Sequence, residues 1–141
     1  MRPLNESPID QLLAAIDNLD VEAAVALMAA GCQMQMADGS RAEGTADARE
    51  LLSSLIATLR EATHHVSAQW HPEEEVWIAE MEATYELKDR LRITVPRAFV
   101  LRGGPQGFLS LHVYGGHEHP LTDHRTGAEG LRLGGRWIPP L

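Results

Sequence analysis

The sequence predicts one α+β domain in which N-terminal helices cover one face of a curved antiparallel sheet. Before Glu61, apolar residues recur at helical spacing, and beyond it the period changes from about 3.6 residues to 2. The loops of the second half are short. Such loops join neighbouring antiparallel strands, because a parallel crossover needs about a dozen residues or more. Helices followed by a meander of strands indicate the α+β class.

The helices are predicted from caps and apolar stripes. Ser7 can cap a first helix, whose apolar residues return to one side every three or four positions. Asp20 can cap a short second helix, and Gly31 suits the left-handed position that follows a helix end. Thr45 or Asp47 can cap a third helix, which has the most regular apolar stripe of the chain.

Strands are predicted where apolar and polar residues alternate. The first is short and closes at the turn Asp38-Gly39-Ser40, and the later ones are long and rich in β-branched and aromatic residues. The predicted strands span residues 32–36, 63–71, 75–88, 91–102 and 106–116.

Composition excludes several classes of function. Cys32 is the only cysteine, so an internal disulfide and a thiolate metal cluster are excluded. The formal net charge of −8 opposes binding to nucleic-acid phosphates. We find no signal-peptide core, no apolar run long enough for a bilayer, no P-loop and no dinucleotide fingerprint. We therefore expect a cytoplasmic protein with no cofactor and no membrane or nucleic-acid partner.

Five short motifs carry a family resemblance. They are Glu43-Gly44-Thr45, His64-His65-Val66-Ser67, the run from Val76 through Glu80, Glu82, Thr84 and Tyr85 to Asp89, Val95-Pro96, and Leu109 to Leu121. With the N-terminal helices that precede them, the resemblance covers roughly residues 8–121. In residue pattern and order they resemble the motifs of the SnoaL-like polyketide cyclases of the nuclear transport factor 2-like superfamily.

The resemblance implies a cone-shaped cavity between helices and sheet, and a homodimer formed through the outer face of the sheet. It implies a SnoaL-like domain over residues 1–121. The remaining residues, 122–141, form a Gly-rich tail that we expect to dock on the domain or on a partner subunit, because large apolar groups in it seldom stay in water. Because related proteins include cyclases, hydrolases, isomerases and non-catalytic binders, the resemblance implies no single chemistry. In the closing strand, His112 and Gly116 stand where enzymes of this kind have an arginine and a carboxylate.

The closing strand offers candidate catalytic residues. Ser110, His112 and Tyr114 share one face of it. The resemblance points this polar face into the cone, where His112 would be a general base and Tyr114 a hydrogen-bond donor, with Ser110 binding ligand. The alternative is a solvated or dimer-facing surface.

Three further charged residues are candidate ligand-binding groups. Glu80 and Glu82 share one face of the strand at 75–88; they either face solvent or enter the cone, where burial would make them usable acids or bases. Arg97 interrupts an apolar face and needs a partner if it is buried, unless a bulge at Pro96 turns it outward. His64 and His65 point to opposite faces of an extended strand, so at most one can line the cavity.

The group His117, His119 and His124 has the spacing of a metal site, but exposed histidines beside a tail are the interpretation we favour, and no metal site is predicted. The predicted function is the binding of a small, largely apolar molecule in a conical pocket, with acid–base isomerase, cyclase or hydrolase activity. The alternative is a non-enzymatic dimerisation or ligand-binding module.

Overall fold

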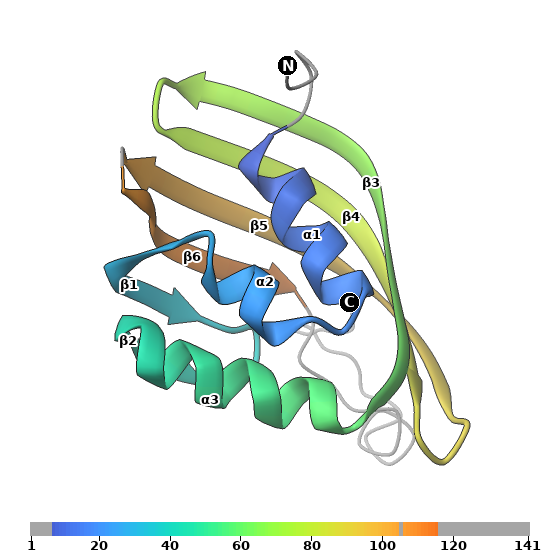
Figure 1. The fold of residues 1–141 in the computed structure, drawn as a ribbon. Coiled ribbons are helices and arrows are strands. Elements are labelled where there is room, and N and C mark those ends of the chain that lie inside the picture. The colour runs from blue at the N-terminus through green and yellow to red at the C-terminus, as the bar shows by residue number, and fades with distance from the viewer. Residues whose placement is uncertain (1–6, 105, 116–141) are drawn as a thin grey trace.

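The computed structural model of the protein describes residues 7–104 and 106–115 (Figure 1). The predicted tail, residues 122–141, lies outside this range, as do His117, His119 and His124. In chain order the elements are α1 (Pro8–Asp17), α2 (Val21–Val25), β1 (Met28–Gln35), β2 (Arg41–Glu43), α3 (Gly44–Ala57), β3 (Leu59–Glu73), β4 (Val76–Leu87), β5 (Arg92–Gly104) and β6 (Gly107–Gly115).

The strands form one sheet in the order β2-β1-β6-β5-β4-β3. β3 to β6 are a consecutive antiparallel meander, as the short loops predict. The sheet is mixed rather than antiparallel throughout, because β1 pairs in parallel with β6. All three helices lie on one side of it (Figure 1), so the predicted α+β class with helices on one face is confirmed.

Helix α1 starts where the sequence predicts. Its N-cap is Ser7, whose hydroxyl accepts a hydrogen bond from the backbone of Asp10 while the Asp10 carboxylate accepts one from the backbone of Ser7. Ile9, Leu12 and the other apolar residues of its stripe are buried. This stripe places α1 across β3, β4 and β5.

The middle of the chain differs from the sequence prediction. Asp20 caps α2 as expected, but Gly31 lies inside β1 and does not end a helix. Helix α3 begins at Gly44, where φ is +85°, and its N-cap Glu43 makes no side-chain cap. Asp47 instead accepts a hydrogen bond from the Glu43 backbone N–H at 3.3 Å, so it supports the helix start from the first turn.

The sheet curves around the helices. β3 is long, and its pairing with β4 shifts register at three places, each of which bends a strand. Figure 1 shows β3 sweeping from the upper end of α1 to the end of α3. The fully buried core lies between these layers and includes Ile9, Leu12, Cys32, Leu52 and Leu101. In the described part of the chain, no helix has the length and apolar character needed to cross a bilayer.

Candidate functional site

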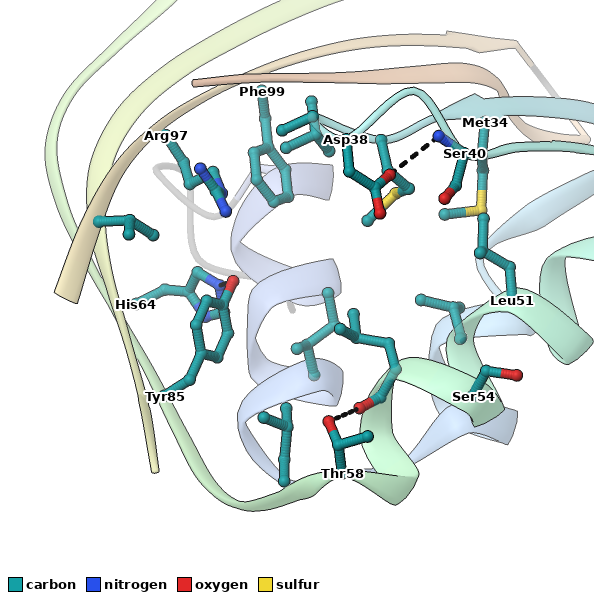
Figure 2. A pocket seen from close by; sticks show the side chains of 18 of the residues that line it. Met34, Asp38, Ser40, Leu51, Ser54, Thr58, His64, Tyr85, Arg97 and Phe99 are labelled. Carbon is teal, nitrogen blue, oxygen red and sulfur yellow. Dashed lines mark hydrogen bonds between the residues drawn. The ribbon is translucent and has the colours of Figure 1, made fainter. Parts of the chain in front are cut away.

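A pocket of about 640 Å³ lies between the helices and the concave face of the sheet (Figure 2). This volume is in the range of small-molecule sites, about 300–1,000 Å³. Its walls are mostly apolar and come from α1, β1, the β1–β2 turn, α3 and the four strands of the meander. The apolar lining includes Leu12, Ile16, Met34, Met36, Leu51, Leu52, Leu55, Leu59, Leu87, Ile93, Val95, Phe99, Leu111 and Val113.

The polar wall of the pocket is supported by an Asp–His pair, of which His64 lines the pocket and Asp17 does not. Asp17 is the last residue of α1, and one oxygen of its carboxylate lies 2.7 Å from His64 Nδ1. Its other oxygen accepts a hydrogen bond from the His64 backbone N–H at 3.3 Å. Because an ionised carboxylate only accepts hydrogen bonds, Nδ1 carries a proton, and the two contacts fix the plane of the imidazole.

His64 connects this pair to a tyrosine. Its Nε2 lies 3.2 Å from the hydroxyl of Tyr85, so in the neutral imidazole Nε2 accepts the hydrogen bond that Tyr85 donates. The ring of His64 also makes edge contacts with the rings of Tyr85 and Phe99. Since only 1% of the His64 side chain is exposed, these neighbours leave the imidazole one orientation.

Tyr85 in turn lies beside Arg97. Burial raises the pKa of Tyr85, and the hydrogen bond and positive charge of Arg97 only partly oppose this shift. Tyr85 is therefore a neutral hydroxyl at physiological pH, able to donate to His64 or to a ligand. Figure 2 shows the polar ends of His64, Tyr85 and Arg97 directed toward the same part of the pocket.

The sheet register explains how three strands bring these groups together. His64 is opposite Ala83 in β4, so Tyr85, two residues further on, shares its face. Arg97 is opposite Met81, which has the same parity in β4 as Tyr85. All three side chains thus stand on the concave face of the sheet.

A second polar region lies at the turn between β1 and β2. Asp38 is exposed and accepts a hydrogen bond from the backbone N–H of Ser40 at 2.9 Å. Both residues line the pocket, together with Ser54 of α3 and Thr58, the residue that follows α3. The hydroxyl of Thr58 donates to the carbonyl of Leu55, so this hydroxyl is engaged at the end of the helix.

The predicted catalytic residues of the closing strand do not line the pocket. β6 contributes Leu111 and Val113 to the wall, whereas His112 and Tyr114 stand on the opposite face of the sheet, where their rings stack 3.9 Å apart. The expected direction of this polar face is therefore wrong. Ser110 also lies outside the lining.

The reason is that sequence parity does not say which face of a strand is covered, and a bulge disturbs the parity itself. Register shifts between Arg102 and Gly103, so that Phe108 is buried and Leu109 is half exposed. Any role of His112, Tyr114 or Ser110 in binding stays a prediction for the outer face.

The other predicted residues divide between the two faces. Glu80 and Glu82 are exposed and do not line the pocket, which agrees with the solvent-facing alternative. Arg97 does line it, and the β4–β5 register is continuous past Pro96, so no bulge turns it outward. His64 enters the pocket and its neighbour His65 does not, as alternation requires.

Asp17 and Tyr85 were not predicted as site residues. Asp17 falls on the polar side of the α1 pattern and looks like an ordinary solvated residue. Tyr85 stands with apolar residues on one face of β4. Its hydroxyl, a polar group among apolar side chains, is the signal that could have identified it. Across the described residues, no three His, Cys, Asp or Glu side chains are grouped to hold a metal ion.

Comparison with known proteins gives matches only at the level of structure. Models of protein families find no match in the sequence, and curated protein sequences contain no significant match. A protein from Catenulispora acidiphila with a ketosteroid isomerase-like fold, solved with trimethylamine, matches with a TM-score of 0.73. Its identity is 16% over 86% of this chain and 92% of that chain.

Two further matches have related descriptions. The epoxide hydrolase/cyclase-like enzyme SalBIII, which acts in pyran ring formation in salinomycin, matches with a TM-score of 0.68 and 18% identity over 78% of this chain and 88% of its own. A Shewanella denitrificans protein named as a SnoaL-like polyketide cyclase matches with a TM-score of 0.73 and 10% identity. The match covers 88% of this chain and 96% of that chain. NTF2-like proteins are also among the matches. This chain therefore has the fold shared by SnoaL-like, ketosteroid isomerase-like and NTF2-like proteins.

Proposed function

We propose that the chain binds a small, largely apolar molecule in the concave pocket and transfers a proton to or from it. The observation that carries the proposal is the hydrogen-bonded series Asp17–His64–Tyr85, which ends at a mostly apolar cavity with Arg97 beside it. An apolar wall supplies binding free energy, and a few fixed polar groups orient the ligand.

The series has the parts that acid–base catalysis needs. In one direction Tyr85 passes its hydroxyl proton to a ligand oxygen and regains a proton from an imidazolium at His64 Nε2. In the reverse direction the Tyr85 oxygen takes a proton from the ligand while its own proton passes to Nε2, and Asp17 stabilises the resulting imidazolium. Arg97 stabilises negative charge that develops on the ligand oxygen. Isomerisation, ring closure and epoxide opening all require such a transfer, and structural matches include a cyclase-like and a hydrolase-like enzyme.

Ligand binding is tested with the neutral fluorophore N-phenyl-1-naphthylamine. Ser54 and Ser53 are adjacent exposed residues of α3, and only Ser54 lines the pocket. We expect Ser54→Trp to weaken binding about tenfold, since the indole would occupy ligand volume, and Ser53→Trp to leave it unchanged. Equal effects of the two variants would place the probe outside the pocket.

Proton transfer is tested by hydrogen–deuterium exchange at the acidic carbon of 2-tetralone, followed by NMR in D2O. The wild type should accelerate exchange, and Tyr85→Phe and His64→Leu should each reduce the acceleration by about a hundredfold, the usual range for one acid–base group. His112→Ala is the control, because His112 stands on the outer face, and it should keep full activity. Acceleration that survives in both pocket variants but is lost in His112→Ala would refute the assignment.

A non-enzymatic homodimer is the second candidate, favoured by the outer face of the sheet. Tyr114 is 47% exposed there and stacks on His112, next to Val100 and Ala98 of β5. A second copy would cover these apolar surfaces. Sedimentation equilibrium of the wild type and Tyr114→Arg tests this: a dimer in the wild type that dissociates in the variant supports it, and a wild-type monomer contradicts it.

A further inference from the structure

Arg97 is the one residue among the described pocket lining that carries a permanent positive charge. It is half-buried, on a strand face that is otherwise apolar, between Val95 and Phe99. Its guanidinium contacts the carbonyl of Pro96 at 3.3 Å and the hydroxyl of Tyr85. A guanidinium that lines a mostly apolar pocket is placed to contact a ligand of opposite charge.

Of the described lining residues only Asp38 is a carboxylate, and Asp17, which contacts His64, is not part of the lining. Asp17 is engaged by the backbone N–H and Nδ1 of His64, so its charge is directed away from the cavity. Asp38 lies in an exposed turn, where water and salt screen its charge more than that of a half-buried group. The polar wall formed by His64, Tyr85 and Arg97 is therefore positive or neutral toward a ligand.

We propose that the natural ligand is a hydrophobic molecule with a carboxylate, and that Arg97 and the hydroxyl of Tyr85 bind that carboxylate. The planar guanidinium matches the two oxygens of a carboxylate, and a charge-assisted hydrogen bond is stronger than a neutral one. The inference rests on the proposed pocket function and adds the class of ligand to it.

The opposite side of the pocket fits the rest of such a ligand. Figure 2 shows Met34 and Leu51 across the cavity from Arg97, His64 and Tyr85, so a polar head and an apolar body would each meet a matching wall. A fused aromatic ring system is much smaller than the cavity of about 640 Å³. The matched probes are therefore 2-naphthoate and 2-naphthamide, which differ in charge and hardly in shape.

Calorimetric titration of both probes at pH 7 separates the two proposals. We expect the wild type to bind 2-naphthoate about tenfold more tightly than 2-naphthamide. In Arg97→Gln this ratio should fall to about one with little change for the amide. Arg102→Gln is the control, because Arg102 is an exposed residue of the same strand whose loss changes the net charge equally.

The outcomes are distinct. Equal affinity of the wild type for both probes, or a preference that persists in Arg97→Gln, overturns the carboxylate inference while leaving the pocket in place. If neither probe binds, the pocket function is contradicted and the inference with it. If Arg97→Gln does not fold by circular dichroism, Arg97→Lys replaces it: it keeps the charge but not the planar fork, and should lose part of the preference. An unchanged ratio in Arg97→Lys, with tenfold weaker binding in 1 M NaCl, would indicate attraction by charge alone and contradict a fitted carboxylate contact.

Discussion

Removal of the Asp17 carboxylate is the perturbation that most directly tests the polar wall of the pocket. Asp17 accepts hydrogen bonds from the backbone N–H and Nδ1 of His64. Asp17→Ala therefore leaves the imidazole without its acceptor. Because the His64 side chain is 1% exposed, water can reach Nδ1 only through the space that the carboxylate vacates.

The expected loss follows from these contacts. A buried donor that loses its partner costs about 1–3 kcal/mol, and the 30% exposure of Asp17 lets water replace part of the bond. We expect the free energy of unfolding to fall by about 1.5 kcal/mol, which lowers Tm by roughly 5 °C in a domain of this size. Asp17→Asn, which keeps an oxygen acceptor, should lose about half as much.

The assay is urea unfolding followed by tryptophan fluorescence, arranged as a double-mutant cycle with His64→Leu. If the Asp17–His64 contact is the cause, Asp17→Ala should cost about 1 kcal/mol less in the His64→Leu background than in the wild type, and this difference is the coupling energy. The same cost in both backgrounds would refute the pair as described. A stable Asp17→Ala protein with undiminished 2-tetralone exchange would remove Asp17 from the proposed mechanism.

Three further predictions concern groups away from the Asp–His pair. The hydrogen bond from Arg60 holds the pKa of Glu86 below its usual value, so the stabilisation is present at neutral pH and is lost as pH falls below about 4.3. Urea midpoints should therefore decline less between about pH 7 and pH 3 in Glu86→Gln than in the wild type, and an equal decline would contradict this contact. Burial raises the pKa of Cys32 to about 11. Ellman's reagent at pH 8 should therefore label the thiol of the protein unfolded in urea and not that of the native protein. Rapid labelling of the native protein would contradict the burial of Cys32. Gly115 has a φ of +141°, and a Cβ there would lie 2.5 Å from the Pro96 carbonyl oxygen. Gly115→Ala should therefore lower the free energy of unfolding by about 2 kcal/mol, measured by thermal melting. An unchanged Tm would contradict this backbone geometry.

Local signals predicted the elements whose causes are local. Ser7 caps α1 because its hydroxyl and the Asp10 carboxylate exchange hydrogen bonds within one turn, and both are readable in the sequence. The meander of β3 to β6 was predictable since each loop is too short for a crossover. β2 was missed because three residues, Arg41–Glu43, are too few to show a period.

Signals that depend on distant partners were not readable. Parallel pairing of β1 with β6 joins residues 77 to 80 positions apart, for example Gln33 with Ser110, and no loop length in the sequence predicts it. The face of β6 that meets the pocket depends on this pairing and on the bulge at Leu109. The polar residues His112 and Tyr114 were therefore assigned to the cavity, although alternation alone describes either face equally well.

The residues that do line the pocket suggest a better rule for this fold. On β4 and β5, Tyr85 and Arg97 are polar groups set among apolar neighbours of the same parity. A packed core would bury both at a cost in desolvation that no apolar neighbour can offset. Two such residues on adjacent strands indicate instead that the apolar face borders a hollow, where each group meets the other or a ligand. The concave site follows from polar exceptions on the apolar face, and the alternating polar face marks the outside of the sheet.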